Sequence, residues 1–157
     1  PSVEFGLGDA DWESWGAMES LYQDNKTKIL GISNVNLEQL ELLCSKAEVL
    51  PSVVQNRCFA RDGWDGEVRR FCRDNEILYQ GFSLLTANPE VSHHPDFMNI
   101  VQRVNKTSAQ VIFRFAHQVG MLALTGTTST EHMREDLACF EFKLTEEELR
   151  MIEEISL

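Results

Sequence analysis

Short runs of apolar residues alternate along the chain with longer stretches in which apolar side chains recur every three or four positions. The short runs predict strands over 28–33, 52–56, 77–81 and 121–125. Parallel strands must be joined by long crossovers, usually helices, so this alternation favours an α/β fold with a parallel sheet. The middles of three of these runs are almost entirely apolar, which predicts strands buried on both faces.

The longer periodic stretches predict helices, three of which carry capping signatures. Asn36, Thr107 and Thr145 are each followed three residues later by Gln or Glu, the pattern of a capping box. The first helix is expected over 12–24, after a loop at 1–11, with one apolar stripe. The others are expected after Asn36 and over 65–74, 96–104, 107–119, 129–138 and 146–155. The apolar stripe of the first helix is Trp15, Met18, Leu21 and Tyr22. Residues 84–95 form the longest irregular stretch.

Polar or small residues stand at the carboxyl end of every predicted strand. They are Ser33-Asn34, Gln55-Asn56, Ser83 and the segment 125–128. Barrels of the (β/α)8 type build their sites on that face. A doubly wound dinucleotide fold would instead place G-x-G-x-x-G after its first strand, and that motif is absent here. We therefore expect a single domain made of four strand–helix units of a parallel (β/α)8, TIM-type barrel.

Composition narrows the range of functions. The chain has 157 residues, 43% of them hydrophobic, and a net charge of −11. An acidic surface repels phosphate backbones, so we expect no nucleic-acid partner. No apolar run approaches the ~20 residues of a membrane helix, and no signal peptide is apparent. We expect a cytoplasmic protein without a membrane partner, and the absence of an initial Met indicates a trimmed or partial chain.

The cysteines and histidines give little support to a metal site. The four cysteines form no C-x-x-C pair, so free thiols in a reducing compartment are expected. His93 and His94 precede Pro95, which breaks the helical spacing that a ligand pair needs. They are interpreted as residues of a loop or helix start, and no metal is expected. Tyr22 and Tyr79 are interpreted as packing residues.

Two segments could bind a small ligand. In residues 124–131, a strand is followed by a glycine turn rich in hydroxyls and then by a helix start, where free N–H groups attract anions. A well-capped helix start explains the same residues. Ser33, Asn34 and Gln55 are neutral donors and acceptors that suit an amide or carboxamide. Hydrogen bonding among the strand ends is the alternative interpretation, and the local pattern leaves both open.

Taken together, the motifs resemble the aldo-keto reductase family over nearly the whole chain from about Trp12. The segment 28–35, KILGISNV, resembles the family's G-[IV]-S-N-[FV] motif, and 107–116, TSAQVIFRFA, resembles its T-x-A-Q-[VL]-x-[LI]-R-[WF] helix. Further matches are 15–21 before strand five, 54–56 in strand six, 81–85 after strand seven, and 125–148 at the end. The resemblance implies the C-terminal half of that barrel.

The resemblance also implies site roles by position. Ser33, Asn34 and Gln55 would hold a nicotinamide carboxamide, and Phe82 would stack on the ring where the family usually has tyrosine. The remaining positions would line the rest of the dinucleotide. They are Ser83 and Leu85 at the ribose and pyrophosphate, Gly126, Thr127 and Thr128 at the adenosine-side phosphate, and Glu135 and Asp136 near the adenine amine.

Two departures from the family bear on the cofactor. The family often places lysine where Gly126 stands and arginine where His132 stands, and both neutralise the 2′-phosphate of NADP. Charged hydrogen bonds contribute roughly 1.5–3 kcal/mol each. Backbone donors and the hydroxyls of Thr127 and Thr128 would hold that phosphate instead, with His132 as a weak helper. NADP is therefore the expected cofactor and NAD is the alternative.

A third departure from the family is the absence of its catalytic residues. The family's catalytic Asp, Tyr, Lys and His belong to strand–helix units that precede those found here, so no catalytic residue is assigned. The expected function is carbonyl reduction by an NAD(P)H-dependent oxidoreductase, with this chain inactive alone. A small carbonyl substrate would bind once the first half is present. The alternatives are a non-catalytic binding or structural subunit and a homodimer of halves. Open sheet edges predict either the N-terminal half or a protein partner over them.

Overall fold

The computed structural model describes residues 6–155 and contains one sheet with helices between its strands. The strands are β1 (Gly31–Ser33), β2 (Val53–Arg57), β3 (Leu78–Phe82) and β4 (Leu122–Leu124). They lie in the order β1-β2-β3-β4, and β1 pairs in parallel with β2 through Ile32↔Val54 and Ser33↔Gln55. This confirms the predicted α/β fold with four parallel strands.

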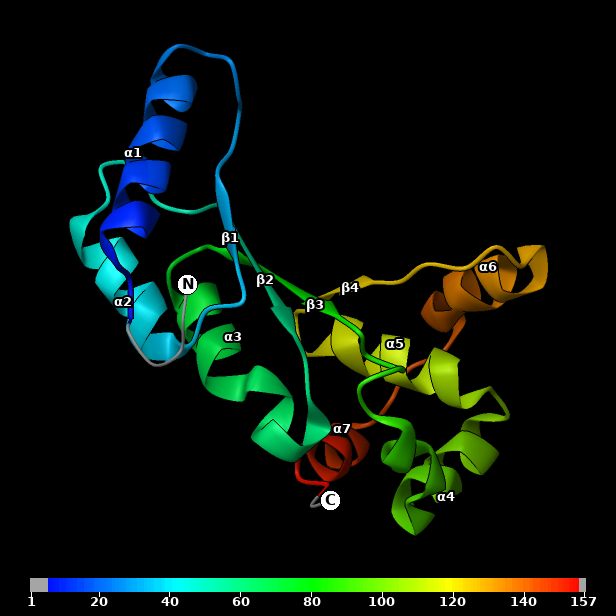
Figure 1. Ribbon diagram of the computed structural model, residues 1–157. Helices are drawn as coiled ribbons and strands as arrows, with labels where there is room; N and C mark the ends of the chain where they lie inside the picture. The colour runs from blue at the N-terminus through cyan, green and yellow to red at the C-terminus, as the bar shows by residue number, and fades with distance from the viewer. Residues whose placement is uncertain (1–5, 156–157) are drawn as a thin grey trace. The chain divides into compact units, whose positions relative to one another are not determined.

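One helix precedes the first strand, and the others fall between and after the strands, as Figure 1 shows. They are α1 (Asp9–Gln23), α2 (Leu37–Lys46), α3 (Gly66–Asp74), α4 (Pro95–Val104), α5 (Ser108–Gln118), α6 (Thr130–Leu137) and α7 (Glu146–Glu153). Short 3-10 helices are η1 (Ala60–Asp65), η2 (Pro89–His93) and η3 (Ala138–Glu141). All three predicted capping boxes are present, at Asn36, Thr107 and Thr145.

The chain divides into two compact units. The first comprises the described residues up to Asn56 together with Glu67–Gln80. The second comprises Arg57–Gly66 and the described residues from Gly81 onward. Strands β1 and β2 place most of their residues in the first unit, and β4 with α4–α7 lies in the second.

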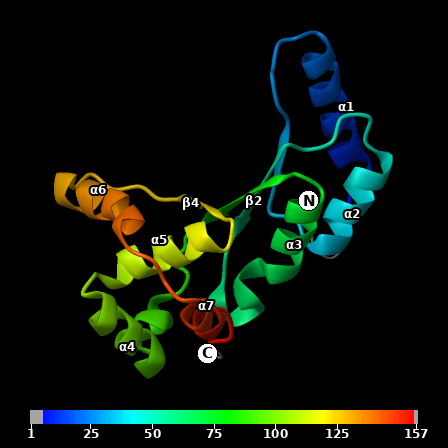
Figure 2. The ribbon, with the colours of Figure 1, turned by 180° about the vertical axis from the view of Figure 1, so that it is seen from behind.

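In the first unit, α1 and α2 lie side by side next to β1 in both Figure 1 and Figure 2. Trp15, Leu30 and Leu43 form its buried cluster, with Met18 and Ile32 packed against them. Burying such side chains stabilises the unit by roughly 1.5–3 kcal/mol each. The apolar stripe of α1 therefore packs as predicted at its first two positions, Trp15 and Met18.

A single carboxylate joins α1 to the loop after α2. Glu19 Oε1 accepts hydrogen bonds from the backbone N–H groups of Glu48 and Val49, at 2.8 and 2.9 Å, and from Trp15 Nε1 at 3.0 Å. Charge-assisted bonds of this kind are stronger than neutral ones. Nothing in the local pattern around Glu19 signals that it joins α1 to this loop, because the two backbone N–H groups that it accepts from are 29 and 30 residues away.

Three predictions about the first unit are wrong. Helix α1 begins at Asp9, so residues 9–11 are not a loop; Asp11 accepts a 3.0 Å bond from Gly8 N and caps the start. The part of the predicted loop at residues 1–5 lies outside the described residues. Leu21 and Tyr22 are 44% and 40% exposed, because the last turn of α1 extends past the buried cluster. Tyr22 is therefore not a packing residue.

Strand β1 is also shorter than predicted. It begins at Gly31 rather than residue 28, and Ile29 is 58% exposed. The register that pairs Gly31 with Val53 places Pro51 opposite Ile29. Proline has no N–H to donate to a ladder, so regular pairing ends there.

In the second unit, α5 is the buried centre. Val111, Ile112 and Phe115 are fully buried, and the ring of Trp64 lies 5.1 Å from that of Phe115. Trp64 Nε1 donates a 2.9 Å bond to the carbonyl of Ile152 and so joins η1 to α7. The T-x-A-Q helix predicted from sequence is thus the element around which this unit packs.

The close packing of this unit also explains one glycine. A Cβ at Gly81 in β3 would lie 2.3 Å from Met121 Sδ, which is closer than side chains tolerate. Met121 is itself 2% exposed and has little room to move. Glycine is therefore required in β3 because another residue occupies the space.

Burial of the strands on both faces is the part of the fold prediction that fails. Leu122 and Leu124 in β4 are 46% and 44% exposed, and Ile29 in the first predicted strand is 58% exposed. Successive side chains of a strand point to opposite faces, so a helix layer covers only alternate positions. Met121 and Tyr79 lie on covered positions, at 2% exposed each. Residues 84–95, predicted to be irregular, contain η2 and the first residue of α4.

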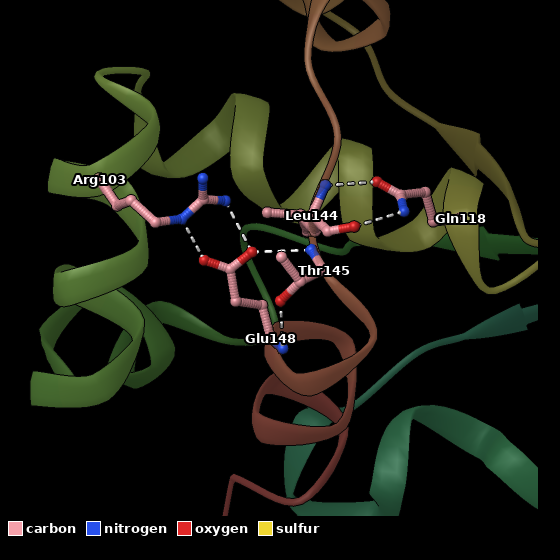
Figure 3. A network of polar contacts seen from close by, with 5 residues as sticks. All are labelled: Arg103, Gln118, Leu144, Thr145 and Glu148. Carbon is pink, nitrogen blue, oxygen red and sulfur yellow. Dashed lines mark hydrogen bonds and ion pairs between the residues drawn. The ribbon is translucent and has the colours of Figure 1, made fainter.

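Figure 3 shows the polar network that fastens α7 to α4 and α5. Arg103 Nε and Nη2 both donate to the Glu148 carboxylate, the Nη2 bond being 2.7 Å long. Glu148 also accepts a 2.8 Å hydrogen bond from Thr145 N. Gln118 accepts from Leu144 N and donates to Leu144 O. Burial raises the pKa of Glu148, but Arg103 and the Thr145 N–H outweigh it, so that pKa lies below its ordinary value.

A lowered pKa in the folded state stabilises the protein above the unfolded pKa of about 4.3, and this stability is lost as pH falls through the folded value. We predict that Glu148→Gln lowers the unfolding free energy at pH 7 by about 1 kcal/mol and flattens its decline toward pH 3. Urea unfolding at both pH values measures this. Glu147→Gln, at the exposed neighbouring position, is the control. Equal pH profiles for Glu148→Gln and the wild type would contradict the assignment.

Candidate functional site

In the first unit, the polar residues at the carboxyl ends of β1 and β2 contact one another. Ser33 Oγ donates to the carbonyl of Gln55 at 2.8 Å, and Asn34 N donates to the same oxygen at 3.0 Å. Asn34 Nδ2 lies 3.1 Å from Ser33 Oγ, and Gln55 Nε2 donates to Gln80 Oε1. Hydrogen bonding among strand ends, the alternative drawn from sequence, is therefore present.

The backbone at this edge is held in an unusual conformation. Asn34 has φ +56°, a left-handed conformation that asparagine tolerates better than most residues. The buried Asn56 donates from Nδ2 to Val35 O at 2.7 Å and accepts from Val35 N at 3.1 Å. The sequence indicated Asn56 only as a polar residue at a strand end. In the structure, Asn56 fixes the turn that presents Asn34. Asn34 is exposed and Ser33 and Gln55 are half-buried, so a ligand can reach them.

In the second unit, β3 ends at Phe82, whose carbonyl accepts from Cys58 N at 3.1 Å. Ser83 has φ +58°, and its carbonyl accepts from Ala87 N at 2.9 Å. Phe82, Ser83 and Leu85 are half-buried. The aromatic ring and the hydroxyl predicted to face a ligand are thus partly accessible.

Asn88 fixes this segment, and sequence analysis missed it. Its side chain is buried and makes three bonds to backbone: from Nδ2 to Cys58 O and Leu84 O, both at 2.9 Å, and from Ala60 N to Oδ1 at 2.6 Å. Buried polar groups need such partners. The loop predicted to be irregular is therefore anchored at Asn88 and at the buried Leu84.

The start of α6 matches the capped-helix interpretation. Ser129 Oγ accepts from His132 N at 3.3 Å, and Thr127 Oγ1 accepts from Ser129 N at 3.1 Å. His132 Nδ1 lies 3.5 Å from Thr127 Oγ1, so these two predicted site residues are brought together. Gly126, Thr128 and His132 are exposed. The anion-binding interpretation of the segment stays a prediction.

Glu135 and Asp136, expected near an adenine amine, are both half-buried. The carbonyl of Glu135 accepts from Gln110 Nε2 at 3.0 Å, and Asp136 Oδ2 lies 3.4 Å from Thr125 Oγ1. Ser33, Asn34 and Gln55 belong to the first unit and the other predicted site residues to the second. Their convergence in one pocket therefore stays a prediction.

The cysteines and histidines of residues 6–155 form no second candidate site. Burial raises the pKa of the Cys44 and Cys139 thiols, and none of the four cysteines, all of which lie in the described range, forms a disulfide. Within residues 6–155, no group of three His, Cys, Asp or Glu side chains could hold a metal ion. His93 ends η2, and His94 immediately precedes α4 without a capping hydrogen bond from its side chain, its Nδ1 lying 3.9 Å from Asp96 Oδ2. In the same described range, no helix has the length and apolar character to cross a membrane.

Comparison with known proteins identifies the family. An uncharacterized oxidoreductase, YtbE, of Bacillus subtilis is 30% identical over 92% of this chain and 51% of its own length. The NADPH-dependent alpha-keto amide reductase of Saccharomyces cerevisiae is also 30% identical, over 92% and 49%. The 7-acetyl-epi-neemfruitin B aldo-keto reductase of Melia azedarach is 32% identical, over 90% of this chain and 46% of its own length. The chain belongs to the aldo-keto reductase family. It spans about half the length of the curated relatives it matches, and no family model matches it.

Solved structures agree on the fold. An aldo-keto reductase of the silkworm Bombyx mori has 24% sequence identity and a TM-score of 0.81, over 91% of this chain and 46% of its own. An aldo-keto reductase structure complexed with NADPH gives the same values. At this identity the likeness establishes the fold alone, which is about half of the family's barrel.

We predict that Asn88→Ala loosens the segment after β3. Three backbone groups lose their buried partner, which costs about 2–4 kcal/mol in all. Limited proteolysis should then cut within 84–93 faster than in the wild type, and the urea midpoint should fall. Asn99→Ala, at an exposed position in α4, is the control. Equal cleavage of the Asn88 and Asn99 variants would show that the anchor is not needed.

Proposed function

We propose that this chain provides the dinucleotide-binding half of an NAD(P)H-dependent carbonyl reductase. Its membership of the aldo-keto reductase family supports the reaction class, because one relative is described as NADPH-dependent and a related structure was solved with NADPH. The observation that carries the proposal is the cluster of Ser33, Asn34 and Gln55 at adjacent strand ends. NADP is the proposed cofactor and NAD is the alternative.

The residues in the first unit fit a nicotinamide carboxamide. A carboxamide needs one acceptor for its NH2 and one donor for its carbonyl. The Asn34 amide is exposed and offers both, and the Gln55 amide and Ser33 hydroxyl lie beside it. All three groups are neutral, so they would orient the carboxamide without adding charge. Phe82, partly accessible at the end of β3, would supply an aromatic face to the ring.

The segment before α6 fits the adenosine-side phosphate. Helix N-termini attract anions, and the chain around 126–132 offers the hydroxyls of Thr127 and Thr128 together with His132. Thr127 Oγ1 and His132 Nδ1 are 3.5 Å apart and could contact the same group. Ser83 and Leu85 would line the ribose and pyrophosphate. Glu135 and Asp136 would lie toward the adenine.

When bound, the dinucleotide supplies a hydride for reduction of an aldehyde or ketone. The chain's own part is to bind and orient, because neither tyrosine is suited to proton donation. Tyr79 is buried and Tyr22 lies on the exposed end of α1. We propose that the proton donor and the carbonyl substrate's remaining contacts come from the other half of the barrel.

A non-catalytic role in binding a partner is the second candidate. It is favoured by the exposed Leu122 and Leu124, since two adjacent apolar side chains on one strand face are costly in water. We propose that, in this second case, a protein in place of the other barrel half covers this face.

We predict that Ser33→Ala raises the dissociation constant for NADPH by about three- to tenfold, since one hydrogen bond contributes roughly 0.5–1.5 kcal/mol. Isothermal calorimetry on the full chain measures this. Ser45→Ala is the matched control, because Ser45 Oγ bonds only its own helix, at Leu42 O. Absence of saturable NADPH binding by the wild type would refute the proposed function. Equal binding by the two variants would refute only the role of Ser33.

We also predict that the 157-residue chain alone does not remain a monomer. Its exposed strand face and unpaired sheet edges favour association. Light scattering across a concentration series should show a mass above 17.9 kDa. Leu124→Lys should shift the distribution toward monomer. A monodisperse monomer with cooperative unfolding would contradict the need for a covering half.

A further inference from the structure

A cation lies over the aromatic ring at the end of β3. Arg57 is the last residue of β2, and its guanidinium carbon is 5.5 Å from the centroid of the Phe82 ring. This distance falls within the roughly 6 Å range in which a guanidinium is attracted to the face of an aromatic ring. Arg57 is exposed and Phe82 is half-buried. The positive charge is therefore held beside the ring but is open to solvent.

Within the part of the chain that the structure describes, no carboxylate lies at ion-pair distance from Arg57. Other arginines do have such partners: Arg73 pairs with Asp74 and Arg103 with Glu148. In a chain of net charge −11, an arginine left without a carboxylate is a local positive field. That field acts on any charge within a Debye length, about 8–10 Å at ordinary ionic strength.

The two redox forms of a nicotinamide ring differ by one charge at the ring itself. The oxidised ring is a cation and the reduced ring is neutral, while the phosphates are the same in both. A fixed cation near the ring therefore weakens binding of the oxidised form and leaves the reduced form unaffected. Attraction of the same cation to the phosphates would strengthen both forms equally. The ratio of the two affinities isolates the effect at the ring.

We propose that Arg57 is a specificity-determining residue that makes the site prefer the reduced dinucleotide over the oxidised one. The proposal rests on the proposed function, because it requires Phe82 to receive the nicotinamide ring. It adds a role for a residue that no motif in the sequence singled out. Its consequence is easier release of the oxidised product, which favours turnover in the direction of carbonyl reduction.

The size of the effect follows from the exposure of Arg57. Two unit charges separated by about 6–10 Å near a protein surface repel one another, but solvent screens an exposed arginine strongly. We therefore expect Arg57 to contribute about three- to tenfold to the affinity ratio of reduced to oxidised dinucleotide. The contribution should shrink as salt is added.

The test measures dissociation constants of NADPH and NADP+ by calorimetry on the full chain. Arg57→Met removes the charge and keeps an apolar stem, and Arg57→Lys keeps the charge. Arg61→Met is the matched control, because Arg61 also lies over a ring, that of Phe59, at 4.5 Å. We expect the NADPH preference to fall about three- to tenfold in Arg57→Met and to be largely kept in Arg57→Lys and Arg61→Met. Raising the salt should reduce the preference in the wild type and leave Arg57→Met unchanged.

The outcomes separate this inference from the function on which it rests. If the wild type binds neither form saturably, the proposed function and the inference both fail. If the wild type binds both forms but Arg57→Met keeps the same ratio, only the inference fails. If Arg57→Met weakens the binding of both forms by the same factor, the inference also fails, because Arg57 then acts on the phosphates rather than on the ring. Because Arg57 is exposed, the variants should fold, and a circular dichroism melt matching the wild type verifies this.

Discussion

The parallel pairing of β1 with β2 is the constraint on which the candidate site depends. Its register places Ser33 opposite Gln55, so that two polar residues 22 positions apart in the chain meet at one edge. Parallel strands all end at the same edge of a sheet, which is why polar strand ends collect there. If that register slipped by one residue, Ser33 and Gln55 would turn to opposite faces, and the cluster of polar residues at this edge would be lost.

Polar side chains, three of them buried, then hold the loops in place. Asn56 fixes the turn after β1 and Asn88 fixes the segment after β3. Glu19 holds the loop after α2, and Glu148 fastens the start of α7 to α4. In every case, an amide or carboxylate satisfies backbone groups that would otherwise lack partners. Such fully satisfied contacts stabilise one loop conformation over the alternatives.

The exposed leucines of β4 and the extent of the family match support one interpretation. Helix α5 packs against β4 in the second unit, while Leu122 and Leu124 remain exposed. The chain spans about half the length of its curated relatives. A closed barrel fills its interior with alternate side chains from every strand, so a half barrel leaves those side chains in water. The proposed dinucleotide-binding role and the proposed covering half therefore belong together.

The amino-acid sequence by itself determined the order of strands and helices, the capping boxes at Asn36, Thr107 and Thr145, and the family. These depend on local periodicity and on short motifs, which act over a few residues. Only the tertiary structure decided which face of each strand is covered, that β1 begins just after the position opposite Pro51, and which groups the Asn88 and Arg57 side chains contact. Those outcomes depend on partners far away in sequence, such as Cys58 for Asn88 and Phe82 for Arg57. No local pattern records a contact that forms only when two distant segments meet.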